Sequence, residues 1–180
     1  PVERSSVTAS FILSAQSRSL ELHLAIRWLE TGDPNRGIPG LRLALPTNLR
    51  KPAGQYEIPF GQVDRQEHEG EEVPALRWAN VVGEGPDGPA GLAVVNSGQA
   101  GHSLDGSTLR VNLIRSSYDP DPLPELGDHE LRLTLRPHDG SLTPADLTRS
   151  AEAFHHPLQV VTADGDGDAS LPGEAAAVSK

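Results

Sequence analysis

The sequence contains no cysteine, which excludes both a disulfide framework and a zinc site built from thiolates. Lysine is scarce: the only two are Lys51 and Lys180, and the net charge is −10, so no nucleic-acid partner is expected. No run of about 18 apolar residues is present, so no membrane-spanning helix is predicted. No basic segment precedes an apolar stretch, so no signal peptide is predicted and we expect a cytoplasmic protein of bacterial origin.

Aromatic residues are few, with three Phe, two Tyr and two Trp, whereas glycine (18) and proline (16) are abundant. Frequent glycine and proline favour many turns and short elements over long helices. The 180 residues suffice for one ordinary domain or two small ones. They can also bury a core without covalent or metal staples.

Strict alternation of apolar and polar residues is the main structural signal. In the segment 20–28, leucine, isoleucine and tryptophan occupy every second position, so a strand would place them all on one face. Three shorter segments, 41–45, 109–113 and 131–135, repeat this pattern around polar residues or alanine. Further strands are predicted at 7–13, 58–64, 75–82, 91–96 and 158–162, and turn-rich stretches at 31–40, 84–88, 98–106 and 119–127.

One helix is predicted near residues 144–154. Thr143 can cap it, Pro144 fits its first position and Asp146 follows the cap by three residues. Many strands and one helix indicate an all-β fold, a large antiparallel β-sandwich. We assign residues 1–163 to the sandwich and 164–180, rich in Gly, Asp and Ala, to a flexible tail.

Three motifs contain residue types that could bind a metal or transfer a proton. The repeat from Asp164 to Asp168 has the ligand spacing of a calcium loop, but the required glycine and the closing glutamate are missing, so an acidic tail is preferred. His155 and His156 fit a helix end better than a metal site. In the cluster 128–130, His129 and Glu130 point to opposite faces of a strand, which favours a structural role. No catalytic centre emerges from the residues.

Several segments in order resemble the carboxy-terminal region of glycoside hydrolase family 38, the α-mannosidases. They are SLELHLAIRWLE (19–30), LRLALPTNLRKP (41–52), QYEIPFGQVDR (55–65), PALRWANV (74–81), GLAVVNSGQAGHSLDGSTLRVNLIRSS (91–117), DPDP (119–122), GDHELRLTLRPHDG (127–140) and HPL (156–158). The resemblance covers roughly residues 19 to 162 and rests on the order and spacing of the motifs together.

The resemblance implies a galactose-mutarotase-like supersandwich that belongs to a retaining hydrolase of terminal α-mannosides. It implies that the nucleophile and a zinc ion lie in an amino-terminal catalytic domain of the same polypeptide, so this chain holds no cofactor and no catalytic residue. An α-mannoside or oligosaccharide is the expected ligand of the full enzyme, and a homo-oligomer stays open. The alternatives are an independent carbohydrate-binding module and a protein-interaction sandwich unrelated to sugars.

The segment 96–118 is the part that the resemblance places nearest the sugar. Arg115 is its main candidate, because a guanidinium can hold sugar hydroxyls or orient a carboxylate. An ion pair with Asp119 or Asp121 at the strand end is the competing interpretation. Asn96, Asp105 and Tyr118 are the other candidates near substrate, and Asn96 is also expected to cap the following turn. Gly101 and Gly106 are assigned to turns. Trp28 and Trp78 could stack on sugar, but their place in alternating strands favours burial.

Overall fold

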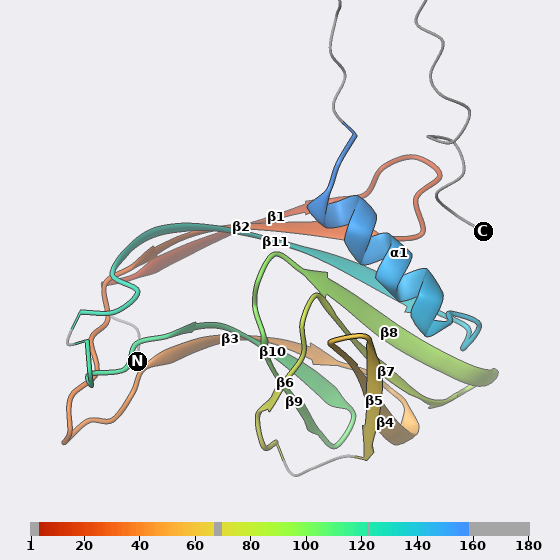
Figure 1. Cartoon of the computed structure of the whole chain (residues 1–180), viewed down its shortest axis with the longest axis horizontal. Coiled ribbons are helices and arrows are strands. Elements are labelled where there is room, and N and C mark those ends of the chain that lie inside the picture. Colours follow the sequence, from red (N-terminus) through yellow and green to blue (C-terminus); the bar gives the residue numbers. More distant parts are fainter. Residues whose placement is uncertain (1–3, 67–69, 122, 159–180) are drawn as a thin grey trace, which may run out of the picture.

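The structure is a computed structural model that describes residues 4–66, 70–121 and 123–158 (Figure 1). These residues form eleven strands and one helix. The strands are β1 (Ser6–Ile12), β2 (Leu20–Trp28), β3 (Gly40–Pro46), β4 (Arg50–Ile58), β5 (Gly61–Gln66), β6 (Val73–Pro74), β7 (Trp78–Gly85), β8 (Gly88–Asn96), β9 (Gly101–Asp105), β10 (Thr108–Arg115) and β11 (Gly127–His138). The helix, α1, spans Pro144–His155.

The strands form two sheets, seen one above the other in Figure 1. The larger has seven strands in the order β1-β2-β11-β8-β7-β4-β5, and the smaller has four in the order β3-β10-β9-β6. All pairings between these strands are antiparallel. The fold is therefore the all-β antiparallel sandwich that the alternation predicts.

The core lies between the two sheets and is built from the alternating residues. From β2 it receives Leu22, Leu24, Ile26 and Trp28, and from the smaller sheet Leu104, Leu109, Val111 and Ile114. Burying each such side chain stabilises the fold by about 1.5–3 kcal/mol. The predicted strands at 20–28, 41–45, 109–113 and 131–135 are all confirmed.

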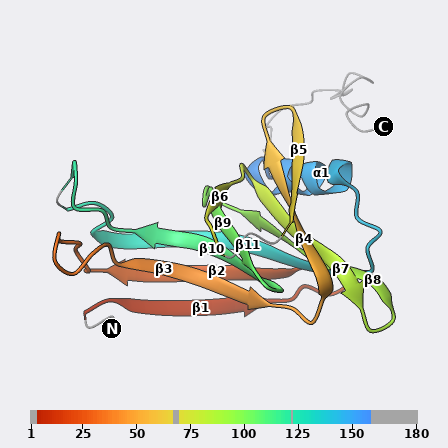
Figure 2. The same cartoon turned by 90° about the horizontal axis from the view of Figure 1, so that it is seen from below.

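Helix α1 covers the outer face of the larger sheet over β7 and β8 (Figures 1 and 2). Its start is the predicted capping box: Thr143 Oγ1 accepts from the Asp146 backbone N–H, and the Asp146 carboxylate accepts from the Thr143 N–H. Leu147 and Ala151 form its buried stripe, in a second cluster with Trp78. No helix in the described ranges is long and apolar enough to cross a bilayer.

The single strand predicted at 58–64 is wrong, and the strand predicted at 75–82 is found with displaced bounds. The segment predicted as one strand at 58–64 contains the hairpin turn, because β4 ends at Ile58 and β5 begins at Gly61. Phe60 occupies this turn with φ +66°, a conformation that residues other than glycine rarely adopt, although Pro59 before it and Gly61 after it are residue types common in turns. The strand predicted at 75–82 begins only at Trp78 and continues to Gly85.

The stretch 98–106 is also only partly a turn, because it contains β9 (Gly101–Asp105). Gly106, at φ +54°, is a turn glycine as predicted. Gly101 is not: it lies in β9, where a Cβ atom would come 2.5 Å from Glu72 Oε1, so its missing side chain makes room for that carboxylate. The predicted strand at 158–162, apart from Leu158, and the calcium-like repeat at 164–168 lie outside the described residues.

Candidate functional site

Arg115, the main candidate, ends β10 and is aimed by a β-bulge. The pairing of β10 with β3 skips Leu113, which is an extra residue between Asn112 and Ile114. Strict alternation from Val111 would place Arg115 on the core face of the sheet. The bulge instead returns Ile114 to the core, with 3% of its surface exposed, and turns Arg115 to the outer face.

On that outer face Arg115 lines an open hollow of about 310 Å³. The other lining residues are Ile38, Gly40, Arg42 and Asn112. Within the described part of the chain, Arg115 forms no ion pair, and neither Asp119 nor Asp121 contacts it as a salt bridge. Its planar set of donors therefore faces the hollow and solvent, where a sugar hydroxyl or a carboxylate could accept from it.

The backbone beside Arg115 is held by buried contacts. Ser116 is fully buried; its N–H donates to the Pro39 carbonyl at 3.0 Å, and its Oγ accepts from the Trp28 indole Nε1 at 2.6 Å. Trp28 itself is 1% exposed and ends β2 of the opposite sheet. The base of the Arg115 side chain is thus tied to both sheets, which limits the conformations of the strand end.

The charged groups next to the hollow already form a local network. Glu72 accepts from Arg42 at 3.3 Å and from Asn112 Nδ2 at 3.2 Å. These contacts give Arg42 a carboxylate partner and hold the Asn112 side chain in the wall of the hollow. The hollow is lined by two arginines. Arg42 pairs with Glu72, whereas Arg115 has no carboxylate partner among the described residues.

The other three candidates do not gather around Arg115. Asp105 ends β9 at the far end of β10, where it pairs with Arg110 at 2.8 Å. At about 3.4 Å per residue, the length of β10 puts roughly 24 Å between Asp105 and Arg115. Tyr118 lies on the Arg115 side, half-exposed, with its ring beside Gly32.

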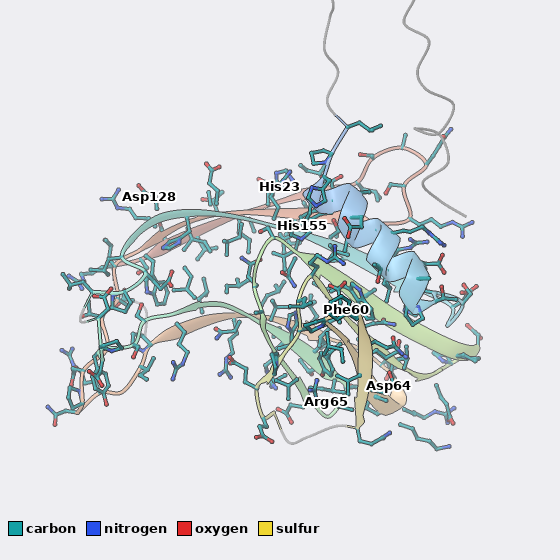
Figure 3. All side chains as sticks on the ribbon, in the orientation of Figure 1. His23, Phe60, Asp64, Arg65, Asp128 and His155 are labelled. Atoms are coloured by element: carbon teal, nitrogen blue, oxygen red, sulfur yellow. The ribbon has the colours of Figure 1, made fainter. Side chains whose placement is uncertain are left out.

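Asn96 is fully buried and serves the scaffold. Its Oδ1 accepts from the Gly98 N–H at 2.9 Å, which confirms the predicted cap of the turn. Its Nδ2 donates to the Leu76 carbonyl, and its own carbonyl accepts from His155 Nε2 at 2.9 Å. Asn96 therefore joins β8, the segment before β7 and the end of α1, where Figure 3 labels His155.

Both tryptophans are buried, as their strand positions predict. Trp28 is 1% exposed and Trp78 is fully buried, so neither ring offers a face to a sugar. The aromatic side chains that are exposed are Phe11, Phe60 and Tyr118.

The histidine motifs have structural partners. His155 is the last residue of α1 and bonds Asn96, while His156 caps the helix and pairs with Glu152. His129 bonds the Glu125 carbonyl from the start of β11. In the ranges that the structure describes, no three His, Asp or Glu side chains gather as metal ligands do.

A second hollow, of about 350 Å³, lies between the β4–β5 hairpin and α1, and sequence reasoning missed it. Its polar wall is Arg77, which pairs with the buried Glu57 at 2.5 Å and also with Glu152 of α1. Hydrogen bonds to these carboxylates raise the pKa of Arg77 and lower that of Glu152. Phe60 stands fully exposed at its rim (Figure 3). The sequence feature that could have indicated this hollow is the segment EIPF (57–60), which supplies Glu57, Ile58 and Phe60 to its lining.

His102 is a buried histidine in the core of the smaller sheet. Burial lowers its pKa to about 4, because the cationic ring would lose its hydration. Its Nδ1 contacts the Ala100 carbonyl at 3.2 Å, while Nε2 has no partner among the described residues. His102 is therefore a neutral core residue.

Residues 1–123 match the family model described as the glycosyl hydrolases family 38 C-terminal domain. Among curated relatives, alpha-mannosidase 2C1 of Mus musculus is 28% identical over 89% of this chain, and alpha-mannosidase G of Dictyostelium discoideum is 26% identical over 87%. The chain spans only 15% and 14% of the lengths of these two relatives.

Two solved structures share the fold. One, an alpha-mannosidase from Enterococcus faecalis V583, gives a TM-score of 0.68 at 16% identity and covers 84% of this chain and 18% of its own. The other, a protein in glycosyl hydrolase family 38 from Enterococcus faecalis, gives 0.69 at 18% identity over 90% of this chain and 19% of its own. The sandwich therefore recurs as a small part of much longer polypeptides.

Proposed function

We propose, from the premise that this chain belongs to the family of glycosyl hydrolases family 38 C-terminal domains, that it is the non-catalytic β-sandwich of an α-mannosidase. In the complete enzyme, an amino-terminal domain of the same polypeptide hydrolyses terminal α-mannosides with retention. The sandwich packs on that domain and shapes one edge of the sugar site, which gives it a part in carbohydrate binding and mannose metabolism. The names and the greater lengths of the curated relatives support this division.

The observation that carries the proposal is the orientation of Arg115. A β-bulge turns this side chain out of the core and into a hollow, where it has no carboxylate partner among the described residues. An arginine left unpaired at a strand end is suited to a partner outside the chain, and bulges recur where a side chain must be aimed. In the assembled enzyme Arg115 holds hydroxyls of the mannoside or orients a catalytic carboxylate.

The reacting groups belong to the absent part of the enzyme. Retention requires two carboxyl groups about 5–5.5 Å apart across the glycosidic bond. We assign both groups, and the zinc ion that the family resemblance implies, to the amino-terminal domain. This chain supplies binding contacts and rigidity, because Ser116 and Trp28 hold the Arg115 backbone between the two sheets.

The proposal is tested with an aryl α-mannoside as substrate. The pure chain is expected to give no hydrolysis above the buffer rate, while the full-length parent polypeptide is active. Deletion of residues 1–158 from the parent is expected to abolish that activity. Turnover by the pure chain, or full activity of the deleted parent, would overturn the proposal.

The alternative function, an independent carbohydrate-binding module, is favoured by one observation. Phe60 is fully exposed at a hairpin turn beside a hollow with the polar groups of Glu57 and Arg77. An exposed aromatic ring next to hydrogen-bonding groups is a common way to bind a sugar face.

Titration of the isolated chain with mannose and mannobiose separates the two functions. A binding module is expected to bind with a Kd below about 10 mM, which corresponds to a few kcal/mol, and to lose binding in Phe60→Ala. Phe11→Ala is the matched control, since Phe11 is exposed on a different strand. A scaffold domain shows no binding at such concentrations.

A further inference from the structure

The first strand of the chain is the least covered part of the sandwich. All seven residues of β1 are exposed, including Val7 at 47% and Phe11 at 63%. Leu13, directly after the strand, is 69% exposed. Isolated apolar side chains on a surface are ordinary, but a row of them along a sheet edge marks an interaction surface.

The register shows that this row lies on the core face of the sheet. Val7 pairs with Ile26 and Phe11 pairs with Leu22 across the β1–β2 ladder, and directly paired residues point to the same side. Ile26 is 2% exposed and Leu22 is 1% exposed. At β1, one strand further out, the residues on this same face are exposed, so the smaller sheet does not extend over β1.

The edge of the smaller sheet on this side is also incompletely covered. β3 is its terminal strand, and its inward residues Leu41, Leu43 and Leu45 are only half-buried. Their partners in β10, such as Val111, are fully buried. Figure 2 shows β1 and β3 along the same margin of the molecule, and Figure 1 shows them in different layers. We call this open margin, formed by β1 and the inward face of β3, the β1–β3 margin.

We propose that the β1–β3 margin is the seat of an apolar strand from the polypeptide that precedes this domain in the parent enzyme. This inference rests on the proposed function, because its occupant is the rest of the same chain. Among the strands that the structure describes, β1 and β3 each have one hydrogen-bonded neighbour, so each can pair with an added strand. Alternating apolar residues of that strand would cover Val7 and Phe11.

The rest of the parent fits this seat better than a second copy. The matching family is a C-terminal domain, and this chain spans 15% of the first curated relatives' length, so most of their polypeptide lies before it. In the parent enzyme that polypeptide is covalently joined to the domain that contains β1. A segment tethered this closely has an effective concentration of the order of millimolar, far above that of a free second copy.

Thiol labelling of single cysteines tests the seat, because the chain has no cysteine of its own. Val7→Cys and Phe11→Cys report the inward row. Thr8→Cys and Ser10→Cys are matched controls on the outward face of the same strand, since they pair with Ala25 and His23. Each variant is made both in this chain and in the full-length parent. Labelling at each introduced residue is followed by mass spectrometry with a maleimide probe.

In the isolated chain all four cysteines are expected to label at similar rates. In the parent, the inward pair is expected to slow by about 100-fold, while the outward pair stays within about threefold. Equal rates for the two rows in the parent would overturn the inference. So would slow, concentration-dependent labelling of the inward row in the isolated chain, because that result assigns the seat to a second copy. Mannosidase activity of the unsubstituted parent is measured separately, so failure of the proposed function is distinguished from failure of the seat.

Discussion

Arg115 and Arg110 share the strand β10, yet their surroundings differ. Arg110 is committed to Asp105 at 2.8 Å, whereas Arg115 faces an open hollow. The pair therefore forms a natural comparison between a structural arginine and one available to a ligand.

Arg115→Lys in the full-length parent is expected to lower kcat/KM for an aryl α-mannoside by about 10–100-fold, since a lost hydrogen bond to a charged group costs about 1.5–3 kcal/mol. Arg110→Lys is the control and is expected to change kcat/KM by less than about threefold. Steady-state kinetics of the two variants check this expectation. Equal effects of the two substitutions would contradict a ligand-facing role for Arg115.

His102 makes stability depend on pH. Its pKa is about 4 in the folded chain and about 6.5 when unfolded, so between these values the unfolded chain binds more protons. Above pH 6.5, His102 is neutral in both states and leaves the free energy of unfolding unchanged. As the pH falls from 6.5 towards 4, the free energy of unfolding decreases progressively, by about 3 kcal/mol in total.

Urea unfolding between pH 7 and pH 4 measures this loss. His102→Phe removes the titrating ring and leaves an apolar side chain in its place. Its unfolding free energy is expected to fall by about 3 kcal/mol less than that of the unsubstituted chain over the same interval. Parallel pH profiles would show that His102 does not titrate in this way.

At the scale of elements, α1 holds the outer face of β7 and β8 through its cap and its apolar stripe. Thr143→Ala is expected to reduce the free energy of unfolding by about 1 kcal/mol, because the Asp146 backbone N–H loses its acceptor. Leu147→Ala should cost more, about 2–5 kcal/mol, since Leu147 is 1% exposed. Thr143→Ser keeps the hydroxyl and is the control for the cap. Chemical denaturation monitored by circular dichroism ranks the three variants, and a loss in Thr143→Ser as large as in Thr143→Ala would contradict the capping role.

Some elements could be predicted from the sequence and others could not, for identifiable reasons. β2 and α1 carry complete signals, alternation in β2 and a capping box in α1, and the structure has both elements where the sequence predicts them. The hairpin turn carries only a partial signal, because Pro59 and Gly61 flank it but Phe60 holds the positive φ; the bulge at Leu113 carries no signal, since leucine is an ordinary strand residue. The orientation of Arg115 depends on that bulge, so alternation alone assigns it to the wrong face.

The candidate site was predictable to a similar degree. The burial of Trp28 and Trp78 and the cap at Asn96 follow from local pattern and were foreseen. The separation of Asp105 from Arg115 depends on the length of β10, which lies between them, whereas the family resemblance places the whole segment 96–118 near the sugar. The contact between Arg77 and α1 joins residues 75 positions apart, which no local pattern reveals.

At the scale of the molecule, this sandwich is open along one margin and presents an arginine without a carboxylate partner in the described part of its face. Both features suit a domain that is completed by a larger body. The share of the relatives that it covers, 15% in alpha-mannosidase 2C1 of Mus musculus, leaves room for that body. We propose that the amino-terminal domain carries out catalysis and that this sandwich supplies binding contacts and structural support.

The most direct measurement of this division is a reconstitution. The amino-terminal portion of the parent is produced together with this chain as a separate polypeptide, and the initial rate of aryl α-mannoside hydrolysis is followed as the chain is titrated. The account predicts no activity from the chain alone, a rate that rises to saturation with added chain, and a saturating rate at least about tenfold lower with the Arg115→Ala chain. Hydrolysis by the chain alone, or a full rate from the amino-terminal portion without it, would contradict the account.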